Sequence, residues 1–373
     1  MKFVIDKPVF LKTLQRVQGI VEKRNTMPIL SNVFLEAQKD SLTLIATDLE
    51  VYIKDSVKAN IFQEGAVSVN ARKLFEIIKE LYDEKVEISV NKENKVTIKS
   101  GKARFNIMGL SSADYPAFPL MDETSFNSVN SDKLKEMIEK TAFAVSTDET
   151  RYNINGFLFE TDGPILRLVA TDGHRLALIE KKDEESSIGK ENKIKVLLPK
   201  KGVAEFKKLL DESEEEKTSG VMLAITQKNA VIKKGNTTIN IRLLEGEFPD
   251  YRKVIPKDNN QTVIADKNTL LSSLKRVSIL STDKIKGVKF KFIKNKLELS
   301  CESPDIGDAT EEVDIEYSGE TIETAFNARY IIDMIETTDN QKIKIELKDN
   351  LNSGVFRPEG ANEYTYVIMP MRL

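Results

Sequence analysis

The stretch Ala170–Leu176 reads Ala-Thr-Asp-Gly-His-Arg-Leu and joins two apolar runs that have the character of β-strands. Asp-Gly between such runs predicts a tight turn, because glycine accepts a positive φ and an aspartate side chain accepts hydrogen bonds from nearby backbone N–H groups. The turn carries His174, the only histidine of the chain. A histidine beside Asp172 and Arg175 is compatible with a general base, but a hairpin with a locally packed imidazole explains the same residues, and we favour the hairpin.

The chain repeats itself. The Ala-Thr-Asp string of the turn also occurs 124 positions earlier, in Ala46–Glu50. Lys267–Val277 matches Lys7–Val17 at five places with an offset of 260, and Asn327–Arg329 repeats Asn70–Arg72 with an offset of 257. A period of about 125 residues is too long for a solenoid, so we predict three similar α+β domains. The expected boundaries are residues 1–125, 126–258 and 259–373.

Each predicted domain has two helices packed on antiparallel strands. In the first domain, Asp6 is a candidate N-cap and Pro8 lies in the first turn of a helix that runs to about Ile20. Spacing at i, i+4, i+7 and i+11 predicts one buried face, made of Phe10, Leu14, Val17 and Val21. The Ala-Thr-Asp turn does not recur in the third domain, where the residues 301–304 are expected in its place.

Composition limits the function classes. The 373 residues carry 56 Lys and Arg against 59 Asp and Glu, a net charge of −3, and no apolar run approaches the length of a membrane span. Cys301 is the one cysteine, which excludes an intramolecular disulfide and fits a reducing compartment. We expect Cys301 to be a half-buried apolar residue, and the chain to be soluble and cytoplasmic with no membrane partner.

Positive charge gathers on the predicted helices. Their exposed positions hold Lys7, Lys12, Arg16, Arg72, Lys73, Lys79, Lys133, Lys135, Lys140, Lys200, Lys201, Lys207, Lys208, Lys267, Lys275, Arg276 and Arg329. A lysine-rich helix face usually serves solvation, but a bias shared by six repeat-related helices favours a surface for phosphates, bound without reading sequence. No base-reading motif, phosphate-binding glycine loop, cysteine pair or histidine cluster is present in the sequence, so we expect neither cofactor nor metal.

Over its whole length the sequence resembles a known family, the bacterial DNA polymerase III β subunits or sliding clamps. The matching strings are Met1–Phe3, Pro28–Asn32, Ala46–Glu50, Ala170–Leu176, Phe248–Arg252 and Val367–Leu373. The resemblance implies three DNA-clamp domains per chain and a head-to-tail homodimer, a ring of six domains whose helices line a central hole. It also implies a processivity factor that encircles double-stranded DNA and is not an enzyme.

The resemblance assigns two sets of site residues. The DNA-facing set is Arg24, Lys73, Arg151, Tyr152, Asn153 and Lys201. The groove that takes a short apolar peptide from partners is Ile154, Thr171, Gly173, His174, Arg175, Leu176, Pro249, Lys253, Val254, Val367, Met369, Pro370, Met371 and Arg372. This sequence departs from some family members at three positions: Asn153 replaces an aromatic residue, Lys253 an arginine, and Gly354 a serine or proline.

The partners implied are the α subunit of DNA polymerase III, the clamp loader complex and other replication and repair proteins that carry a clamp-binding motif. For the subunit interface we expect Arg104, Phe105 and Ile107 to meet the segment Leu271–Ile279. Two other hypotheses stay open at this stage. One is an enzyme that uses Asp172, His174 and Arg175, and the other is a monomeric scaffold that binds DNA without sequence preference.

Overall fold

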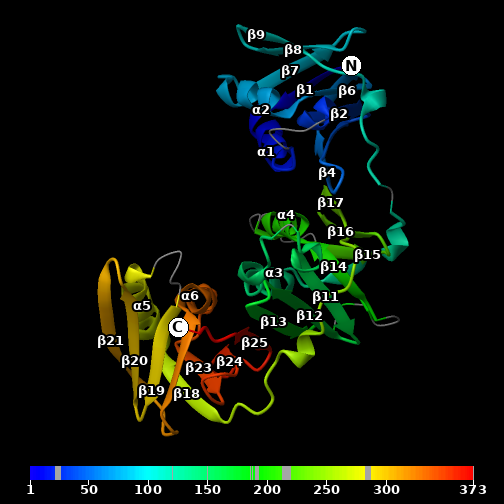
Figure 1. Ribbon diagram of the computed structural model, residues 1–373. Helices are drawn as coiled ribbons and strands as arrows, with labels where there is room; N and C mark the ends of the chain where they lie inside the picture. Colours follow the sequence, from blue (N-terminus) through cyan, green and yellow to red (C-terminus); the bar gives the residue numbers. More distant parts are fainter. Residues whose placement is uncertain are drawn as a thin grey trace. The chain divides into compact units, whose positions relative to one another are not determined.

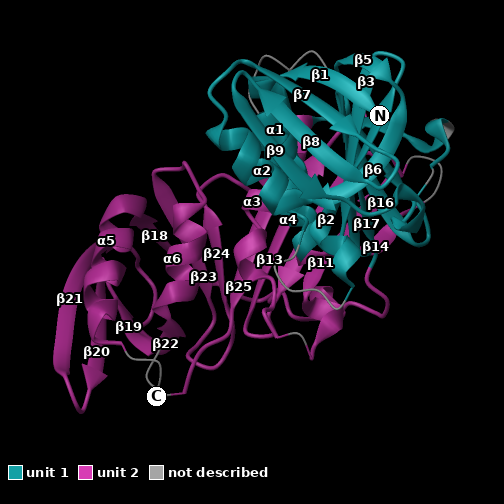
Figure 2. Cartoon of the chain, turned by 90° about the horizontal axis from the view of Figure 1, so that it is seen from above, with its two compact units in different colours: residues 1–130, 201–243 teal, residues 131–200, 244–373 magenta. Residues whose placement is uncertain are grey.

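The computed structural model describes residues 1–21, 27–119, 121–148, 150–184, 186, 188–189, 193–211, 220–281 and 287–372. The chain divides into two compact units, which Figure 1 traces along the sequence and Figure 2 colours separately. Unit 1 comprises residues 1–130 and 201–243, and unit 2 comprises residues 131–200 and 244–373. Each unit is therefore assembled from two separate stretches of the chain.

The described residues form six α-helices: α1 (Lys7–Gln18), α2 (Ala71–Glu80), α3 (Ser131–Glu139), α4 (Lys200–Asp211), α5 (Lys267–Val277) and α6 (Ala328–Glu336). The Asn70 and Asn327 side chains cap α2 and α6 by accepting backbone N–H bonds. Asp6 holds the N-cap position of α1, but its side chain makes no capping bond. The helix α1 ends at Gln18, so Val21 lies beyond it, while Phe10, Leu14 and Val17 are buried as predicted.

Unit 1 holds two antiparallel sheets. The first has the order β5-β1-β7-β8-β9, with β1 (Lys2–Asp6), β5 (Asn60–Gln63), β7 (Lys85–Val90), β8 (Lys95–Ser100) and β9 (Ala103–Met108). The second has the order β10-β15-β16-β17-β4-β3-β2-β6, with β2 (Asn32–Gln38), β3 (Ser41–Thr47), β4 (Val51–Lys58), β6 (Gly65–Asn70), β10 (Asn127–Val129), β15 (Val221–Ile225), β16 (Asn229–Lys234) and β17 (Thr237–Arg242).

Unit 2 holds one twelve-stranded sheet of order β14-β11-β12-β13-β25-β24-β23-β18-β21-β20-β19-β22. Its strands are β11 (Gly156–Asp162), β12 (Ile165–Thr171), β13 (Arg175–Lys182), β14 (Lys195–Pro199), β18 (Gln261–Asp266), β19 (Gly287–Ile293), β20 (Lys296–Ser303), β21 (Gly307–Glu316), β22 (Ile322–Asn327), β23 (Lys342–Leu347), β24 (Gly354–Pro358) and β25 (Tyr364–Ile368). The mixed helix and sheet content agrees with the predicted α+β class.

The strand that follows each Ala-Thr-Asp turn pairs with the last strand of the next repeat. In unit 1, β4 pairs with β17 and places Val51 opposite Ile241. In unit 2, β13 pairs with β25 and places Leu176 opposite Val367. We call these two strand pairs the first and second junctions. Each junction makes one continuous sheet from segments that lie far apart in the sequence.

The third repeat has a turn next to the place predicted for it: of the expected residues 301–304, the first three belong to β20 and only Pro304 lies in the turn. Residues 304–306 connect β20 to β21, where the Ser303 carbonyl accepts the Ile306 N–H at 3.1 Å. Cys301 on β20 is fully buried, not half-buried as expected, and burial raises the pKa of its thiol. Because the side chains of β20 alternate between the core and the surface, Cys301 faces the core.

Candidate functional site

The turn between β12 and β13 is held by its own side chains. Asp172 Oδ1 accepts the backbone N–H groups of His174 and Arg175 at 2.9 and 3.1 Å. Thr171 Oγ1 donates to the Arg175 carbonyl at 2.6 Å and accepts the Gly173 N–H at 3.1 Å. Gly173 has φ +92°, a conformation that side chains disfavour. The sequence therefore dictates this turn locally.

A cavity of about 170 Å³ opens beside the turn. Its lining comprises Arg151, Ile154, Thr171, Gly173, His174, Arg175, Leu176, Phe248, Pro249, Tyr251, Val254, Val367 and Met369. Ten of these residues belong to the predicted groove set. The remaining predicted members Lys253, Pro370, Met371 and Arg372 are not part of the lining; Lys253 is exposed and pairs with Asp250 at 3.2 Å.

Three lining residues were missed by the groove prediction. Phe248 and Tyr251 belong to the string Phe248–Arg252, whose aromatic residues were the available signal, and both are buried. Arg151 was predicted to belong to the DNA-facing set. In the structure its guanidinium donates to the Asp172 carbonyl at 3.2 Å and lies next to Gly173. A Cβ at Gly173 would come within 2.9 Å of this guanidinium, so the Arg151 side chain would have to shift, while the positive φ is what favours glycine at the turn.

The floor of the groove is the surface of an apolar core. The core cluster of unit 2 includes Ile154, Leu176, Phe248, Tyr251 and Val367, and Val254 packs against it. These residues come from a 3-10 helix, the start of β13, the segment 248–251 and the end of β25. An apolar floor with a few polar groups at its margin suits a short apolar segment of a partner.

Arg175 fixes the turn to the rest of unit 2. Its Nε donates to Asp172 Oδ2 at 3.0 Å, its Nη1 donates to Asp333 Oδ2 of α6 at 2.7 Å, and its Nη2 donates to the Phe143 carbonyl. The guanidinium also lies 4.2 Å from the ring centroid of Tyr330. Arg175 is thus a structural anchor of the groove wall, with Asp172 bonded to it and to the turn backbone.

A second polar cluster supports the groove from beneath. The Tyr251 hydroxyl donates to Glu160 Oε2 at 2.8 Å, and Arg252 Nη2 donates to the same oxygen at 2.9 Å. Burial, together with the hydrogen bond to Glu160, raises the pKa of Tyr251 well above its usual value. Tyr251 is therefore a neutral, oriented side chain that presents its ring to the groove.

The predicted DNA-facing residues lie in different parts of the chain. Arg24 lies outside the described residues. Lys73 is exposed on α2 and pairs with Glu76 at 2.9 Å, while Lys201 on α4 pairs with Asp48. Arg151, Tyr152 and Asn153 lie together at a 3-10 helix, where Tyr152 is 63% exposed and Asn153 Nδ2 donates to the Glu247 carbonyl at 3.2 Å.

Many helix cations have carboxylate partners within the chain. These cations are Arg16, Arg72, Lys73, Lys133, Lys140, Lys201, Lys207, Lys208, Lys275, Arg276 and Arg329. In each of the exposed pairs the two charges partly cancel, so the helix faces are less cationic than the sequence alone suggests. Exposed pairs of this kind exchange partners easily, because each stabilises the fold by less than about 1 kcal/mol.

Two negative findings concern the described residues. They contain no group of three or more His, Cys, Asp or Glu side chains placed to hold a metal ion. None of their helices combines the length and the apolar composition that a bilayer crossing requires.

Comparison with known proteins identifies the family. The N-terminal, central and C-terminal domains of the DNA polymerase III beta subunit match residues 1–119, 128–250 and 252–372. The beta sliding clamps of Proteus mirabilis and Pseudomonas putida are 36% and 34% identical, and each alignment covers 100% of both chains.

Solved structures give the same result. The DNA polymerase III subunit beta of Pseudomonas aeruginosa is 33% identical with a TM-score of 0.94, and both chains are covered completely. The DNA polymerase sliding clamp of Bacillus subtilis is 29% identical with a TM-score of 0.94, covering 100% of this chain and 99% of that one. The chain belongs to the family of DNA polymerase III beta subunits, the beta sliding clamps.

Proposed function

We propose that two copies of this chain join head to tail into a ring of six domains, which encircles duplex DNA without reading its sequence and tethers the replicative polymerase. The observation that carries the proposal is the threefold repeat, which gives each chain three domains of one kind and two junctions of one design. Domain boundaries at residues 1–125, 126–258 and 259–373 follow from the repeat. The role is non-catalytic and cytoplasmic.

Two strand edges support the head-to-tail contact. β9 is the last strand of its sheet, and it exposes Phe105 and Met108 by 40% and 69%. β21 pairs with β18 only at Ile315 and Glu316, so most of its length has one unpaired side. Arg104 gives the first edge positive charge, and Asp308 and Asp314 give the second edge negative charge, to which Glu311 and Glu312 add little because they pair with Arg276 and Lys296. Edges of opposite charge favour pairing between two copies, with residues 271–279 beside them.

DNA contact is assigned to Lys73 and Lys201 on the helices, to the segment Arg151–Asn153, and to Arg24. Lysine and arginine on a sliding surface need only hold phosphates loosely, because the ring keeps the duplex enclosed. Lys73 and Lys201 each have a carboxylate partner, which partly cancels the positive charge and keeps a contact with phosphate weak.

The groove beside Gly173 is assigned to a short apolar peptide of the polymerase α subunit, the clamp loader and other replication or repair partners. Its walls combine a rigid turn, anchored through Arg175, with the flexible side chain of Met369. Methionine adapts to different apolar ligands, which suits one site shared by several partners. His174, Pro370, Met371, Arg372 and Lys253 belong to the margin of this site.

Retention on DNA tests the ring. The protein is loaded on nicked circular DNA and on the same DNA after linearisation, and the bound fraction is measured by gel filtration. We expect slow loss from the circle and rapid loss from the linear form, because only the linear form has ends to slide off. Equal loss from both forms, together with a monomer in sedimentation at micromolar concentration, would instead support a monomeric scaffold that binds DNA without sequence preference.

A further inference from the structure

The carboxylate partners of the helix cations in unit 1 differ in their exposure to solvent. Three of them are almost buried, with side chains 1%, 5% and 8% exposed: Asp55 of the Arg16 pair, Asp48 of the Lys201 pair and Glu205 of the Lys208 pair. The partner of Lys73 is different, because the Glu76 side chain is 41% exposed and also pairs with Arg72 at 2.8 Å. We call Arg16, Lys201 and Lys208 anchored cations, and Lys73 an exchangeable cation.

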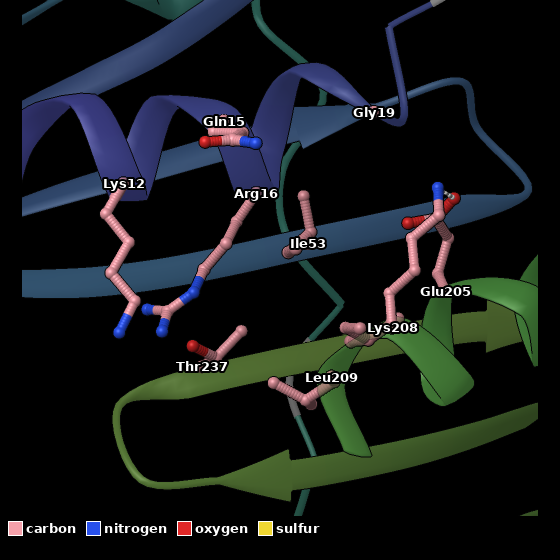
Figure 3. A pocket seen from close by; sticks show the side chains of 10 residues that line it. Lys12, Gln15, Arg16, Gly19, Ile53, Glu205, Lys208, Leu209 and Thr237 are labelled. Carbon is pink, nitrogen blue, oxygen red and sulfur yellow. Dashed lines mark hydrogen bonds and ion pairs between the residues drawn. The ribbon is translucent and has the colours of Figure 1, made fainter. Parts of the chain in front are cut away.

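Two of the anchored cations line a cavity of about 460 Å³ within unit 1, between α1 and α4. Figure 3 shows Arg16 extending from α1 toward Thr237 of β17, and Lys208 next to Glu205 on α4. The Arg16 and Lys208 side chains are 13% and 64% exposed. The cations of these pairs are therefore more accessible to solvent than the carboxylates that hold them.

The cavity owes its space to small residues of the first junction. The sequence offset and the strand register relate Gly19, Thr237 and Ile239 of the first junction to Phe143, Tyr364 and Tyr366 of the second. In the second junction the rings of Phe143 and Tyr366 contact each other at 5.4 Å between centroids. The solvent access of Arg16 and Lys208 is thus a property of the first junction.

Asp48 is the buried carboxylate whose two oxygens have separate partners. Its Oδ1 accepts the backbone N–H groups of Glu50 and Val51 at 3.0 and 2.7 Å, and so shapes the first turn. Its Oδ2 pairs with Lys201 in the first turn of α4. Because one oxygen serves the turn and the other holds the cation, an asparagine at this position keeps the turn and loses the ion pair.

The burial of a carboxylate decides how easily its cation can leave. When a lysine turns from an exposed carboxylate to a phosphate, water takes its place at little cost. When a lysine leaves a buried carboxylate, a negative charge stays in the protein without its partner, which is strongly unfavourable. DNA affinity rises with the number of cations that neutralise phosphates and release counterions. An anchored cation therefore contributes less to this affinity than an exchangeable one.

We propose that Asp48 restrains Lys201 at the DNA-facing surface, and that exchangeable cations such as Lys73 supply the grip on phosphates. This role rests on the proposed function, which assigns both lysines to DNA, and it ranks the two. Asp48 is a positioning residue, because it acts on the duplex only through Lys201. The other two anchored cations are restrained in the same way by their own buried carboxylates.

Fluorescence anisotropy of a labelled linear duplex, titrated with the full-length chain at several salt concentrations, tests this ranking. The measured quantity is the slope of the logarithm of affinity against the logarithm of salt concentration. Lys73→Ala should make the slope shallower by about 0.9, the contribution of one phosphate contact. This change corresponds to about 3.5-fold in affinity between about 50 and 200 mM salt. Lys201→Ala should change the slope by less than about a third as much, since an anchored cation releases few counterions.

Asp48→Asn gives an independent result. This variant keeps the acceptor of the turn and releases Lys201, so we expect the slope to become steeper by about 0.9 and the affinity at low salt to rise. Adding Lys201→Ala to the variant should remove the gain, because the gain comes from that lysine. The matched control Glu50→Gln removes the same charge from an exposed position of the same turn, and should keep the wild-type slope.

Three outcomes would overturn the role of Asp48 and leave the proposed function intact. They are equal changes of slope in Lys73→Ala and Lys201→Ala, an unchanged slope in Asp48→Asn, and a gain in Asp48→Asn that persists without Lys201. Circular dichroism of each variant should match that of the wild type. Absence of salt-dependent DNA binding by the wild type would overturn the proposed function together with the ranking of the two lysines.

Discussion

β4 follows the first Ala-Thr-Asp turn and joins β17, and β13 follows the second turn and joins β25. The two turns share the hydrogen bonds that their Thr and Asp side chains accept from the backbone. Asp48 Oδ1 accepts the N–H groups of Glu50 and Val51 at 3.0 and 2.7 Å, as Asp172 does for the residues that follow it. Arg242 N–H donates to the Glu50 carbonyl at 2.8 Å, as Met369 N–H does to the His174 carbonyl at 3.0 Å.

The side chains differ at the turn end of the two junctions. Leu49 occupies the position of Gly173, with φ +79°. Tyr52 occupies the position of Leu176, and its ring contacts that of Phe118 at 6.1 Å between centroids. The second junction has no ring at these two places and forms the groove. A repeated backbone thus leaves a cavity only where small residues replace large ones.

On the side of the junctions that packs against the helices, the first junction has the cavity and the second is filled. The first junction keeps Gly19, Thr237 and Ile239 around a cavity, and the second fills the corresponding space with three aromatic rings. Arg175 stands where the first junction has the buried Val51. The comparison teaches that each junction is closed on one side and open on the other, so side-chain volume and not strand pairing decides where a cavity forms.

The largest expected effect concerns the anchor of the second junction. Arg175→Ala removes one of the two cations that pair with Asp333, in a position where the Arg175 and Asp333 side chains are 9% and 14% exposed, and leaves Asp333 only the exposed Arg329 at 2.8 Å. Breaking a mostly buried ion pair costs about 3 kcal/mol. Hydrogen exchange should show faster opening of β13 and α6, by a free-energy difference of that size.

Arg72→Ala is the matched control, because the Arg72–Glu76 pair is 68% and 41% exposed. We expect its effect on exchange in α2 to stay below about 0.5 kcal/mol. Unchanged exchange in α6 of the Arg175 variant would show that the second junction does not depend on this anchor.

The next prediction concerns Gly173→Leu, which gives the second turn the leucine that the first turn has at the corresponding position, Leu49. In Gly173→Leu the new side chain collides with the Arg151 guanidinium and enters the groove. We expect affinity for a polymerase tail peptide, measured by fluorescence anisotropy, to fall at least about tenfold, because the new side chain takes up space in the cavity. The strained φ is present with and without peptide, so it lowers the stability of the fold by about 1 kcal/mol and leaves the affinity unchanged.

Gly163→Leu serves as the control for backbone strain. Gly163 also has a positive φ, of +59°, but a Cβ there meets nothing within 4 Å. The control should bind the peptide like the wild type. If both variants bind alike, the groove beside the turn is not the peptide site.

A smaller effect is the pH dependence of stability at a position where the two junctions carry different residues. Glu136 stands where the first junction has Lys12. Burial alone would raise the pKa of Glu136, but hydrogen bonds from Lys140 and Lys181 outweigh it and hold the pKa below its usual 4.5. A carboxylate with a depressed pKa stabilises the fold above its unfolded pKa, and this contribution is lost as the pH falls through the folded value.

We therefore expect the exchange protection of α3 to fall between about pH 5 and pH 3 by less than about 1 kcal/mol, since the group is partly exposed. Glu136→Gln should flatten this part of the pH profile. A profile that stays unchanged in the variant would assign the acid sensitivity to other carboxylates.

The smallest effect tests whether Leu49 is needed at the first turn. Leu49→Gly removes the strain of φ +79° but increases the conformational freedom of the unfolded chain, so we expect net stabilisation of about 0.5 kcal/mol at most in urea unfolding. Destabilisation beyond about 1 kcal/mol would mean that the Leu49 side chain closes the first junction by packing, although it is exposed.

Local sequence decided much of the fold. The apolar spacing of Phe10, Leu14 and Val17 predicted the buried face of α1, and the Thr-Asp-Gly order predicted the turn with its side-chain hydrogen bonds. These features depend on residues within a few positions of one another, so they are readable from the chain itself. The threefold repeat and the family resemblance were readable for the same reason, because both compare strings along the sequence.

Tertiary structure alone decided which side chains meet. Arg151 reaches Gly173 across 22 positions, Arg175 reaches Asp333 of α6, and Tyr251 bonds the buried Glu160. The distant carboxylate partners of some helix cations, such as Asp55 for Arg16 and Glu311 for Arg276, likewise come from packing between distant segments, whereas pairs such as Arg72–Glu76 are local. Such contacts depend on the volumes and charges that fold together at each junction, and no local pattern encodes them.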